Sequence, residues 1–271
     1  MHSATDLPLG KPGATALSNK PKLPLFSALT SGVIIVLAAL WFLQINMVDI
    51  AVASPRFAAF FFERFMPPNF AIIPPSIGLI LETVLFAVVG TGISAILSLV
   101  FGLLLSEKTN GIAWLRHVVR LLLSFLRNVP VLVWASLLIF IFGIGSIVGL
   151  IAIIFATLGF LARSYAESLS EVAGSKVEAL KAVGASKAQV LFHGILPEFV
   201  PAWINWTLFT FEINLRASAI LGMVGAGGIG IVIQTNLRLL RYNNALALII
   251  TLTALILATE FITNKLRRRI K

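Results

Sequence analysis

The apolar residues of this chain come in blocks, most of them about 20 residues long or longer. A helix needs about 20 residues to cross roughly 30 Å of hydrocarbon, so blocks of this length predict membrane-spanning helices. Only 12% of the residues are charged, whereas soluble domains average about 25%. We therefore expect an all-α, polytopic membrane protein with about six spans. The expected spans are residues 30–48, 76–105, 118–142, 147–162, 199–221 and 245–261.

The blocks and the stretches between them divide the chain into four parts. Residues 1–27, rich in Pro, Gly, Ser and Lys, predict a flexible cytoplasmic tail before a first transmembrane helix at 28–48. Residues 49–75 mix aromatic residues with paired prolines and predict an extracytoplasmic interfacial helix and loop. Residues 76–271 form the core, which holds a polar loop at 164–198.

Two details of the spans follow from single residues. Pro130 predicts a kink in the third span, because proline removes one backbone donor and clashes with the preceding turn. Ala51-Val52-Ala53 resembles a signal-peptidase site, which offers cleavage after the first apolar block as an alternative. The length of that block and the extended tail before it favour a retained span.

The formal net charge of +10 raises the question of nucleic acid, but the placement of the charges argues against it. Lysines precede the first apolar block, and Lys265, Arg267, Arg268, Arg269 and Lys271 follow the last. Basic residues are concentrated in alternate connections, which predicts that these connections and both termini are cytoplasmic. Anionic lipid accounts for the excess positive charge.

Several kinds of chemistry lack a signature in the sequence. The chain has no cysteine, and His2, His117 and His193 lie far apart, so we expect no metal site. No G-x-x-x-x-G-K-[ST] motif occurs, so energy from ATP would have to come from a partner. No Ser, His and Asp set with signature spacing is present, so we do not expect an enzyme.

The polar loop carries the helix-start and helix-stop signals. Ser175-Lys176-Val177-Glu178 and Ser186-Lys187-Ala188-Gln189 have the S-x-x-E/Q form of a capping box. Gly184 lies between them, where a helix that ends near Val183 would need a residue that tolerates positive φ. The loop is therefore predicted to form helix, glycine turn and helix.

Val177, Leu180 and Val183 form an apolar stripe on the first of these short helices. Periodicity alone leaves two partners for the stripe: the protein's own spans or another protein. A DNA-reading helix-turn-helix is disfavoured, because acidic and basic residues nearly balance here and membrane spans flank the segment closely.

Glu178-Ala179-Leu180-Lys181-Ala182-Val183-Gly184, with Ile195-Leu196-Pro197, resembles the signature E-A-A, three residues, G, nine residues, I-x-L-P of ABC importer permeases. Leu180 stands in place of the second alanine, and Gly194 in place of the isoleucine. In that family this segment is the coupling helix, seated in a groove of a cytoplasmic ATPase. The residues that the resemblance assigns to coupling are Glu178, Ala179, Leu180, Lys181, Gly184, Ala185, Leu196 and Pro197.

Residues 211–219 and 222–230 are similar to the phosphonate-type permeases within that family. The resemblance implies a type I importer permease in the bacterial cytoplasmic membrane, working as a homodimer. It also implies two copies of an ABC ATPase, which bind ATP and Mg²⁺, and an extracytoplasmic solute-binding protein. The implied substrates are phosphonate, phosphite or phosphate esters. An amino acid carried by the same architecture is the first alternative, and a membrane channel or enzyme is the second.

Polar residues inside the spans are candidates for the translocation path, because a lone charge in hydrocarbon costs at least about 2.5 kcal/mol. Glu212 and Arg216 are spaced i, i+4, which predicts either a helix-internal ion pair or an anion path. Near a span end, Arg127 is expected to snorkel to the headgroups. The path candidates are Glu82, Asn128, Glu212, Asn214, Arg216 and Ser218.

Gly225-Ala226-Gly227-Gly228-Ile229-Gly230 fits G-x-G-x-x-G, but it follows a membrane span and no acidic residue lies about 20 positions on. We therefore reject a dinucleotide site. Glycines at this spacing predict a backbone that bends or approaches another segment closely. Gly225, Gly227, Gly228 and Gly230 are expected to line a gate or to pack closely.

Overall fold

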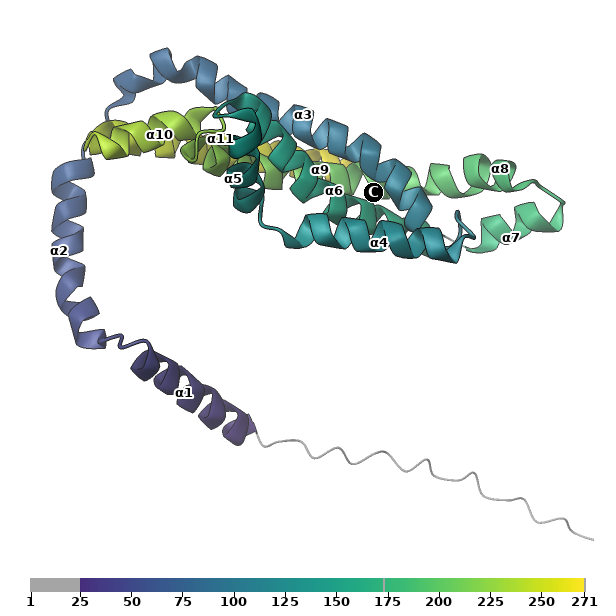
Figure 1. Ribbon diagram of the computed structural model, residues 1–271, viewed down its shortest axis with the longest axis horizontal. Helices are drawn as coiled ribbons and strands as arrows, with labels where there is room; N and C mark the ends of the chain where they lie inside the picture. Colours follow the sequence, from purple (N-terminus) through teal and green to yellow (C-terminus); the bar gives the residue numbers. More distant parts are fainter. Residues whose placement is uncertain (1–24, 173, 271) are drawn as a thin grey trace, which may run out of the picture. The chain divides into compact units, whose positions relative to one another are not determined.

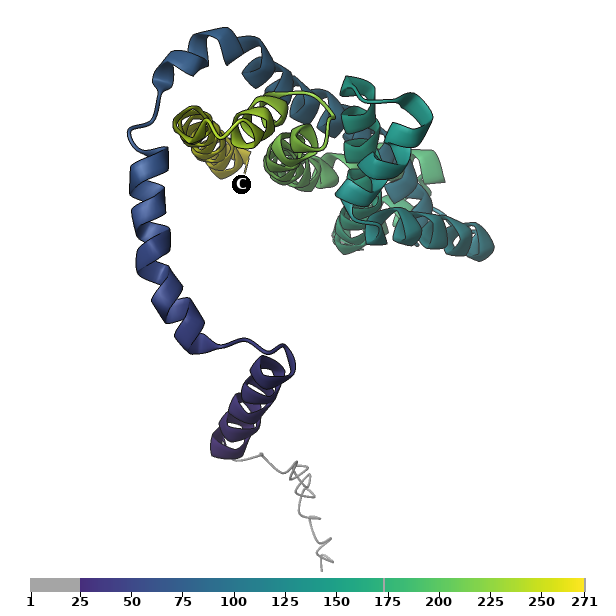
Figure 2. The same cartoon turned by 60° about the vertical axis from the view of Figure 1, so that its left-hand side comes forward.

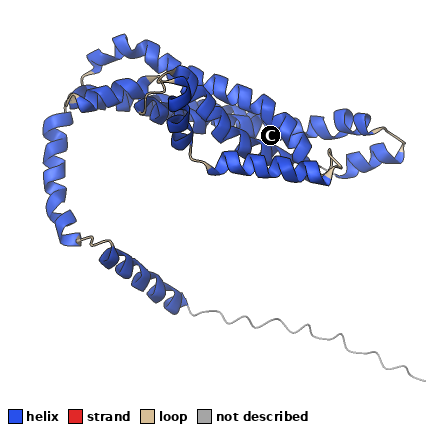
Figure 3. Ribbon diagram, viewed as in Figure 1, coloured by secondary structure: helices blue, strands red, loops and turns tan. Residues whose placement is uncertain are grey.

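The computed structural model describes residues 25–172 and 174–270, apart from the side chains of Leu25, Phe26 and Ser175. The described residues form helices and connections, with no strand among them (Figure 3). The chain divides into two compact units, residues 1–59 and 60–271, which are described separately. The predicted tail lies largely outside the described residues.

The first unit contains α1 (Leu25–Phe42) and most of α2 (Met47–Phe65). The two helices meet at a bend of 74°. The predicted first span ran to residue 48, but α1 ends at Phe42, and Gln44 in the break has a φ of +54°. The apolar side chains of α1 are exposed, Trp41 by 83%, as expected for a helix in lipid.

In the second unit, α3 (Ile73–Leu105), α6 (Ser146–Glu171) and α9 (Leu196–Met223) pack against one another. Figures 1 and 2 show these three helices side by side. Glycines allow the close approach of α3 to α6, since a Cβ at Gly90 would stand 2.8 Å from Ile153 Cγ2. Small residues thus let the two helices bury side chains against each other, among them Ala87 and Ala95 of α3 and Ala152 and Ala162 of α6.

The other elements of this unit surround the three helices. A short 3-10 turn (Phe70–Ile72), capped by the Asn69 side chain, precedes α3. Pro74 and Pro75 lie in the first turn of α3, where proline is tolerated. α4 (Ala113–Asn128) and α5 (Val131–Phe142) contact α6, and α10 (Ile229–Arg238) and α11 (Tyr242–Ile270) contact α9. α7 (Gly174–Ala182), α8 (Lys187–Gln189) and a π-helical turn (Val190–Ile195) connect α6 to α9.

Among the described residues, three helices are long and apolar enough to cross a membrane singly: residues 70–105, α6 and α11. Each of the bent pairs α1/α2 and α4/α5 adds one span if it is counted as a single crossing. The predicted fifth span corresponds to α9, which has 28 residues but falls outside this set because its polar residues lower its hydropathy. The prediction of about six spans agrees with this arrangement.

Two predicted boundaries differ from the structure. Pro130 breaks the third span instead of kinking it: α4 ends at Asn128 and α5 leaves at 91°. The residue before a proline avoids the helical region, and Val129 has φ −83° and ψ 120°, so the break spans two residues. The polar loop, expected from residue 164, begins only after α6 ends at Glu171.

Candidate functional site

The segment of residues 174–197, here called the α7–α8 segment, extends beyond one end of the packed helices (Figure 1). Gly184 ends α7 with a φ of +80°, as predicted. The Gly184 N–H donates to Lys181 O and the Ala185 N–H donates to Leu180 O, both at 3.0 Å. These two bonds form a Schellman motif, which satisfies carbonyls that the helix end leaves open.

One of the two predicted capping boxes is present. Ser186 Oγ accepts from the Gln189 N–H at 3.4 Å, and Gln189 Oε1 accepts from the Ser186 N–H at 2.8 Å. For the other box, Ser175 lies inside α7, which begins at Gly174, so it is not at the expected cap position. The Ser175 side chain is outside the described residues. Helix, glycine turn and helix is therefore the observed order.

The predicted apolar stripe of α7 divides between two environments. Val177 is 7% exposed and belongs to a core cluster with Tyr165 and Phe199, and Leu180 packs against the same cluster. Val183 is 80% exposed. Two members of the stripe thus fasten α7 to the protein's own helices, and the third is free for a partner.

An exposed face of α7 surrounds Val183. Glu178, Ala179, Lys181 and Gly184 are exposed, while Lys176 Nζ lies 2.6 Å from Glu198 Oε1 on α9. Of the other predicted coupling residues, Ala185 and Leu196 are half-buried and Pro197, at the start of α9, is exposed. The segment therefore presents an exposed surface on one side and is packed against the protein's own helices on the other.

The ion pair within α9, one of the two alternatives predicted for Glu212 and Arg216, is not formed. Glu212 pairs with Arg267 and accepts a hydrogen bond from Thr263, while Arg216 Nη2 lies 3.4 Å from Glu260 Oε2. All three partners belong to α11, which runs beside α9. The i, i+4 spacing allows an internal pair, but packing of α11 offers each charge a better-placed partner.

The two pairs differ in exposure. Glu212 is buried, and the Arg267 guanidinium also lies 5.9 Å from the centre of the Phe209 ring. The Arg216 and Glu260 side chains are 51% and 43% exposed. Both pairs join α9 to α11, but Arg216 keeps a free side on the surface of the bundle, whereas Glu212 is buried between the helices.

Asn214 lies at a junction of three helices. Its side-chain amide donates to Thr91 on α3 and accepts from Thr157 on α6, both at 2.9 Å. Ser218 is buried beside it and donates to the Asn214 carbonyl at 2.7 Å. Asn214 therefore bonds between helices and Ser218 bonds within α9, and their predicted place on the translocation path stays a prediction.

Glu82 holds the glycine-rich turn between α9 and α10. Its carboxylate accepts from the Gly228 N–H at 3.0 Å and from Ser146 Oγ at 2.6 Å. The neighbouring Thr83 accepts from the Ile229 N–H at 2.8 Å. Gly225, Gly227 and Gly228 all have positive φ, so this turn needs glycine for its backbone as well as for its contacts.

Close packing explains the other glycines of this stretch. A Cβ at Gly230 would stand 2.6 Å from Met223 N, and a Cβ at Gly228 would stand 2.5 Å from Thr83 Oγ1. α10 therefore folds back tightly on the end of α9. The glycines pack closely, as one of the two predicted alternatives has it, and a role in gating stays a prediction.

Asn128, the last residue of α4 and a predicted path residue, is exposed at the break before Pro130.

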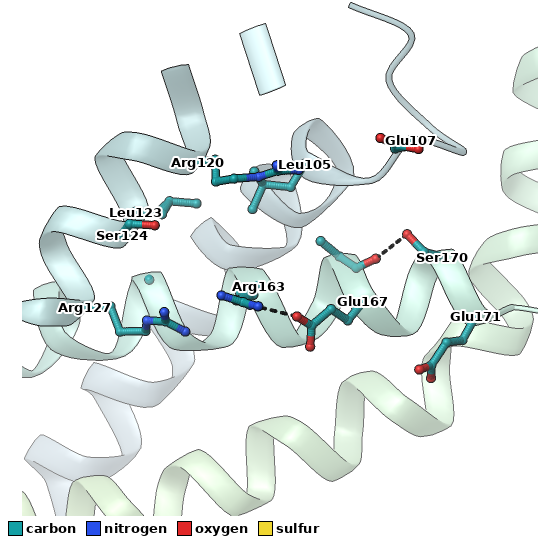
Figure 4. Close-up of a pocket in the computed structure, with 12 residues that line it drawn as sticks. Leu105, Glu107, Arg120, Leu123, Ser124, Arg127, Arg163, Glu167, Ser170 and Glu171 are labelled. Atoms are coloured by element: carbon teal, nitrogen blue, oxygen red, sulfur yellow. Dashed lines mark hydrogen bonds and ion pairs between the residues drawn. The ribbon is translucent and has the colours of Figure 1, made fainter. Parts of the chain in front are cut away.

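A cavity of about 580 Å³ lies between α4 and α6 (Figure 4). Arg120 and Arg127 from α4 and Arg163 from α6 line it. Sequence reasoning missed this site, although a spacing of seven residues puts Arg120 and Arg127 on one face of a helix. Arg127 lines this cavity and is exposed, beside the apolar contact that Val119 and Leu123 of α4 make with α6, and its expected snorkelling stays a prediction.

Comparisons with known proteins agree with these features. The family model described as "binding-protein-dependent transport system inner membrane component" matches residues 98–271, more than half of the chain. The chain belongs to this family. It is a permease subunit of an ABC importer, and the match includes the α7–α8 segment, α9, the glycine turn and α11.

Several relatives of the permease are named for the transport of phosphite or phosphate. It is 30% identical to the phosphite transport system permease protein PtxC of Stutzerimonas stutzeri over 88% of this chain and 86% of that protein. It is 33% identical to the phosphate-import permease protein PhnE of Mycolicibacterium smegmatis, over 76% of this chain and 39% of that longer protein.

The fold of the permease also matches solved structures. The MetNI methionine ABC transporter in an inward-facing conformation aligns with 73% of this chain and 98% of the matched chain, with a TM-score of 0.61 and 23% identity. This likeness supports the type I importer fold. Among residues 25–172 and 174–270, no group of three or more His, Asp or Glu side chains is arranged to hold a metal ion.

Proposed function

We propose that the permease forms, with a second copy, the path by which a phosphonate-class anion crosses the bacterial cytoplasmic membrane. The observation that carries this proposal is the similarity to permeases named for phosphite and phosphate, over most of the chain. Phosphonate, phosphite and phosphate esters share a tetrahedral oxyanion, so one path can serve each of them.

The exposed face of α7 would receive the ATPase. Val183 is an unpartnered apolar side chain between charged neighbours, and Val177 and Leu180 anchor the same helix to the core of the bundle. A partner that moves α7 therefore also pulls on α6 and α9. Two ATPase copies, which bind ATP and Mg²⁺, would drive alternating access from this end.

A solute-binding protein would deliver the anion at the opposite end, where the glycine turn and the loops before α3 and α11 lie. The α7–α8 segment would be cytoplasmic, because it belongs to the alternate connections in which the basic residues are concentrated. An amino acid as substrate is the alternative, because a methionine transporter shares the fold.

Competitive uptake decides between the two substrate classes. Proteoliposomes would carry the permease, its ATPase and its binding protein, and labelled methylphosphonate uptake would be measured against unlabelled phosphite, phosphate and methionine. Inhibition by phosphite with none by methionine supports the proposal. ATP-dependent uptake of methionine without uptake of any phosphorus oxyanion would contradict it.

A further inference from the structure

The cavity between α4 and α6 has a basic end and an acidic end. Figure 4 shows Arg120, Ser124, Arg127 and Arg163 towards one end, and Glu107, Ser170 and Glu171 towards the other. The basic end lies on the side of Gly159, where α4 and α6 approach so closely that a Cβ at Gly159 would stand 2.9 Å from Arg127 Cβ. Arg127 therefore lies where the two helices converge, and Arg120 and Arg163 line the same cavity.

Most of the acidic groups at this cavity already have cationic partners. Glu107 Oε1 lies 3.3 Å from Arg116 Nη2, and Glu167 Oε1 lies 2.7 Å from Arg163 Nε. Glu171 lies at the acidic end. Within residues 25–172 and 174–270, neither Arg120 nor Arg127 makes a hydrogen bond or an ion pair. Positive charge is thus left over at the basic end.

The arginines of the basic end are open to a ligand, because Arg120, Arg127 and Arg163 are all exposed. Gly159, beside Arg127, lies twelve residues before the end of α6 at Glu171, which is about 18 Å at a rise of 1.5 Å per residue. α6 is itself a candidate membrane span. Cations on a membrane helix that lack an ion-pair partner face water or a ligand, and they mark candidate functional sites.

We propose that Arg120, Arg127 and Arg163 form a binding site for a tetrahedral phosphorus oxyanion, such as inorganic phosphate or a phosphonate group. Each guanidinium presents a planar set of N–H donors that matches phosphate oxygens in pairs. Two unpaired cations match a doubly charged anion better than a singly charged carboxylate. The bond from Arg163 to Glu167 uses Nε, so the terminal nitrogens of Arg163 remain available for the anion.

The site deepens the proposed function, on which it rests for the identity of the anion. The cavity of about 580 Å³ gives the anion room near the arginines, and Glu107 and Glu171 at the other end would repel it. A phospholipid headgroup carries the same phosphate chemistry and is the other possible source of the ligand. The two sources are separated by measuring the binding of free phosphate and the retention of phospholipid on the same variants.

The test uses the full-length permease in maltoside detergent, without the ATPase, so that no nucleotide site contributes. Binding of labelled inorganic phosphate is titrated with and without competing methylphosphonate, and retained phosphatidylglycerol is measured by native mass spectrometry. The variants are Arg120→Gln and Arg127→Gln, singly and together. Arg268→Gln removes the same charge from an exposed position on α11 and is the matched control.

Loss of each arginine should weaken phosphate binding by about tenfold or more, as for other charge-assisted hydrogen bonds, while Arg268→Gln leaves it unchanged. The pair Arg120→Lys and Arg127→Lys retains the charge but loses the paired donors, so it should bind with intermediate affinity. This pair also answers the objection that the glutamine variants misfold.

Two results support the site and one overturns it. Arginine-dependent binding of free phosphate assigns it to a soluble anion, and arginine-dependent retention of phosphatidylglycerol assigns it to a lipid headgroup. If the double glutamine variant matches Arg268→Gln in both measurements, the site does not exist. Failure of methylphosphonate uptake with arginine-dependent phosphate binding intact would overturn the proposed substrate class and leave the site standing.

Discussion

Leu180 on α7 occupies the space that a side chain at Gly194 would need. A Cβ at Gly194 would stand 3.0 Å from Leu180 Cδ1 and 3.7 Å from Val177 Cγ2. Leu180 and Gly194 are the two positions at which the chain departs from the importer signature, one with a larger residue and one with a smaller residue. The two departures therefore compensate each other in volume across the contact between α7 and the π-helical turn.

The compensation predicts how three variants of this contact behave. Gly194→Ile should destabilise the permease by about 1–3 kcal/mol, because the added side chain meets Leu180. Leu180→Ala should also destabilise it, because it leaves a void beside Val177. The double variant should be more stable than Gly194→Ile alone, as measured by thermal unfolding and by co-purification of the ATPase. Simple addition of the two single effects would show that the contact does not couple them.

Matched truncations on α7 separate packing from docking. Val177→Ala should lower the free energy of unfolding by about 1.5 kcal/mol, because it removes buried apolar surface at roughly 0.8 kcal/mol per methylene-sized group. Val183→Ala should change unfolding little, since Val183 is 80% exposed, but it should weaken ATPase association. Pull-down of the ATPase and thermal unfolding give the two readouts. Equal pull-down by Val183→Ala and the parent would argue against docking at this face.

The two ion pairs between α9 and α11 predict unequal effects on stability. Glu212→Gln should cost about 3 kcal/mol, because it leaves Arg267 half-buried without its counter-charge. Glu260→Gln should have a smaller effect, because its partner Arg216 is 51% exposed. Thermal unfolding of the two variants, which carry the same chemical change, makes the comparison. A larger loss of stability in Glu260→Gln than in Glu212→Gln would show that the exposed pair, and not the buried one, holds α11 to α9.

Arg216 is predicted to act in transport. Arg216→Ala should abolish uptake while sparing assembly with the ATPase, because its half-exposed guanidinium can attract an anion within a span. Glu260→Gln retains the cation and should retain uptake. Uptake in proteoliposomes and co-purification are the measurements. Uptake by Arg216→Ala at the parent rate would reduce the residue to a structural role.

The glycine turn predicts a strong effect of one methyl group. Gly228→Ala should destabilise the permease and block uptake, because Gly228 has a φ of +73° and its new Cβ would stand 2.5 Å from Thr83 Oγ1. Gly92→Ala is the control, since Gly92 lies within α3 with nothing within 4 Å of an added Cβ. The control should be neutral or gain about 0.5–1 kcal/mol. Thermal unfolding and uptake are the measurements, and a Gly228→Ala variant that matches Gly92→Ala in both would contradict the prediction.

Sequence reasoning predicted the elements that depend on local chemistry. The spans at α3, α6 and α11 follow from hydropathy, Gly184 ends α7 as expected, and Ser186 caps α8. The break at Pro130 was larger than predicted, because a local rule gives the loss of a hydrogen bond but not the direction in which the next helix leaves. The signature itself identified the family before any contact was known.

The sequence by itself therefore determined that this chain is an all-α membrane protein, because apolar length and cap chemistry act over a few neighbouring residues, while the resemblance of residues 178–197 to the importer signature indicated a permease. Only the tertiary structure decided which charges pair, which of Val177, Leu180 and Val183 is free, and that Arg120, Arg127 and Arg163 share a cavity. Those outcomes depend on residues far apart in the chain. Helix packing alone brings α11 beside Glu212 and α4 beside α6.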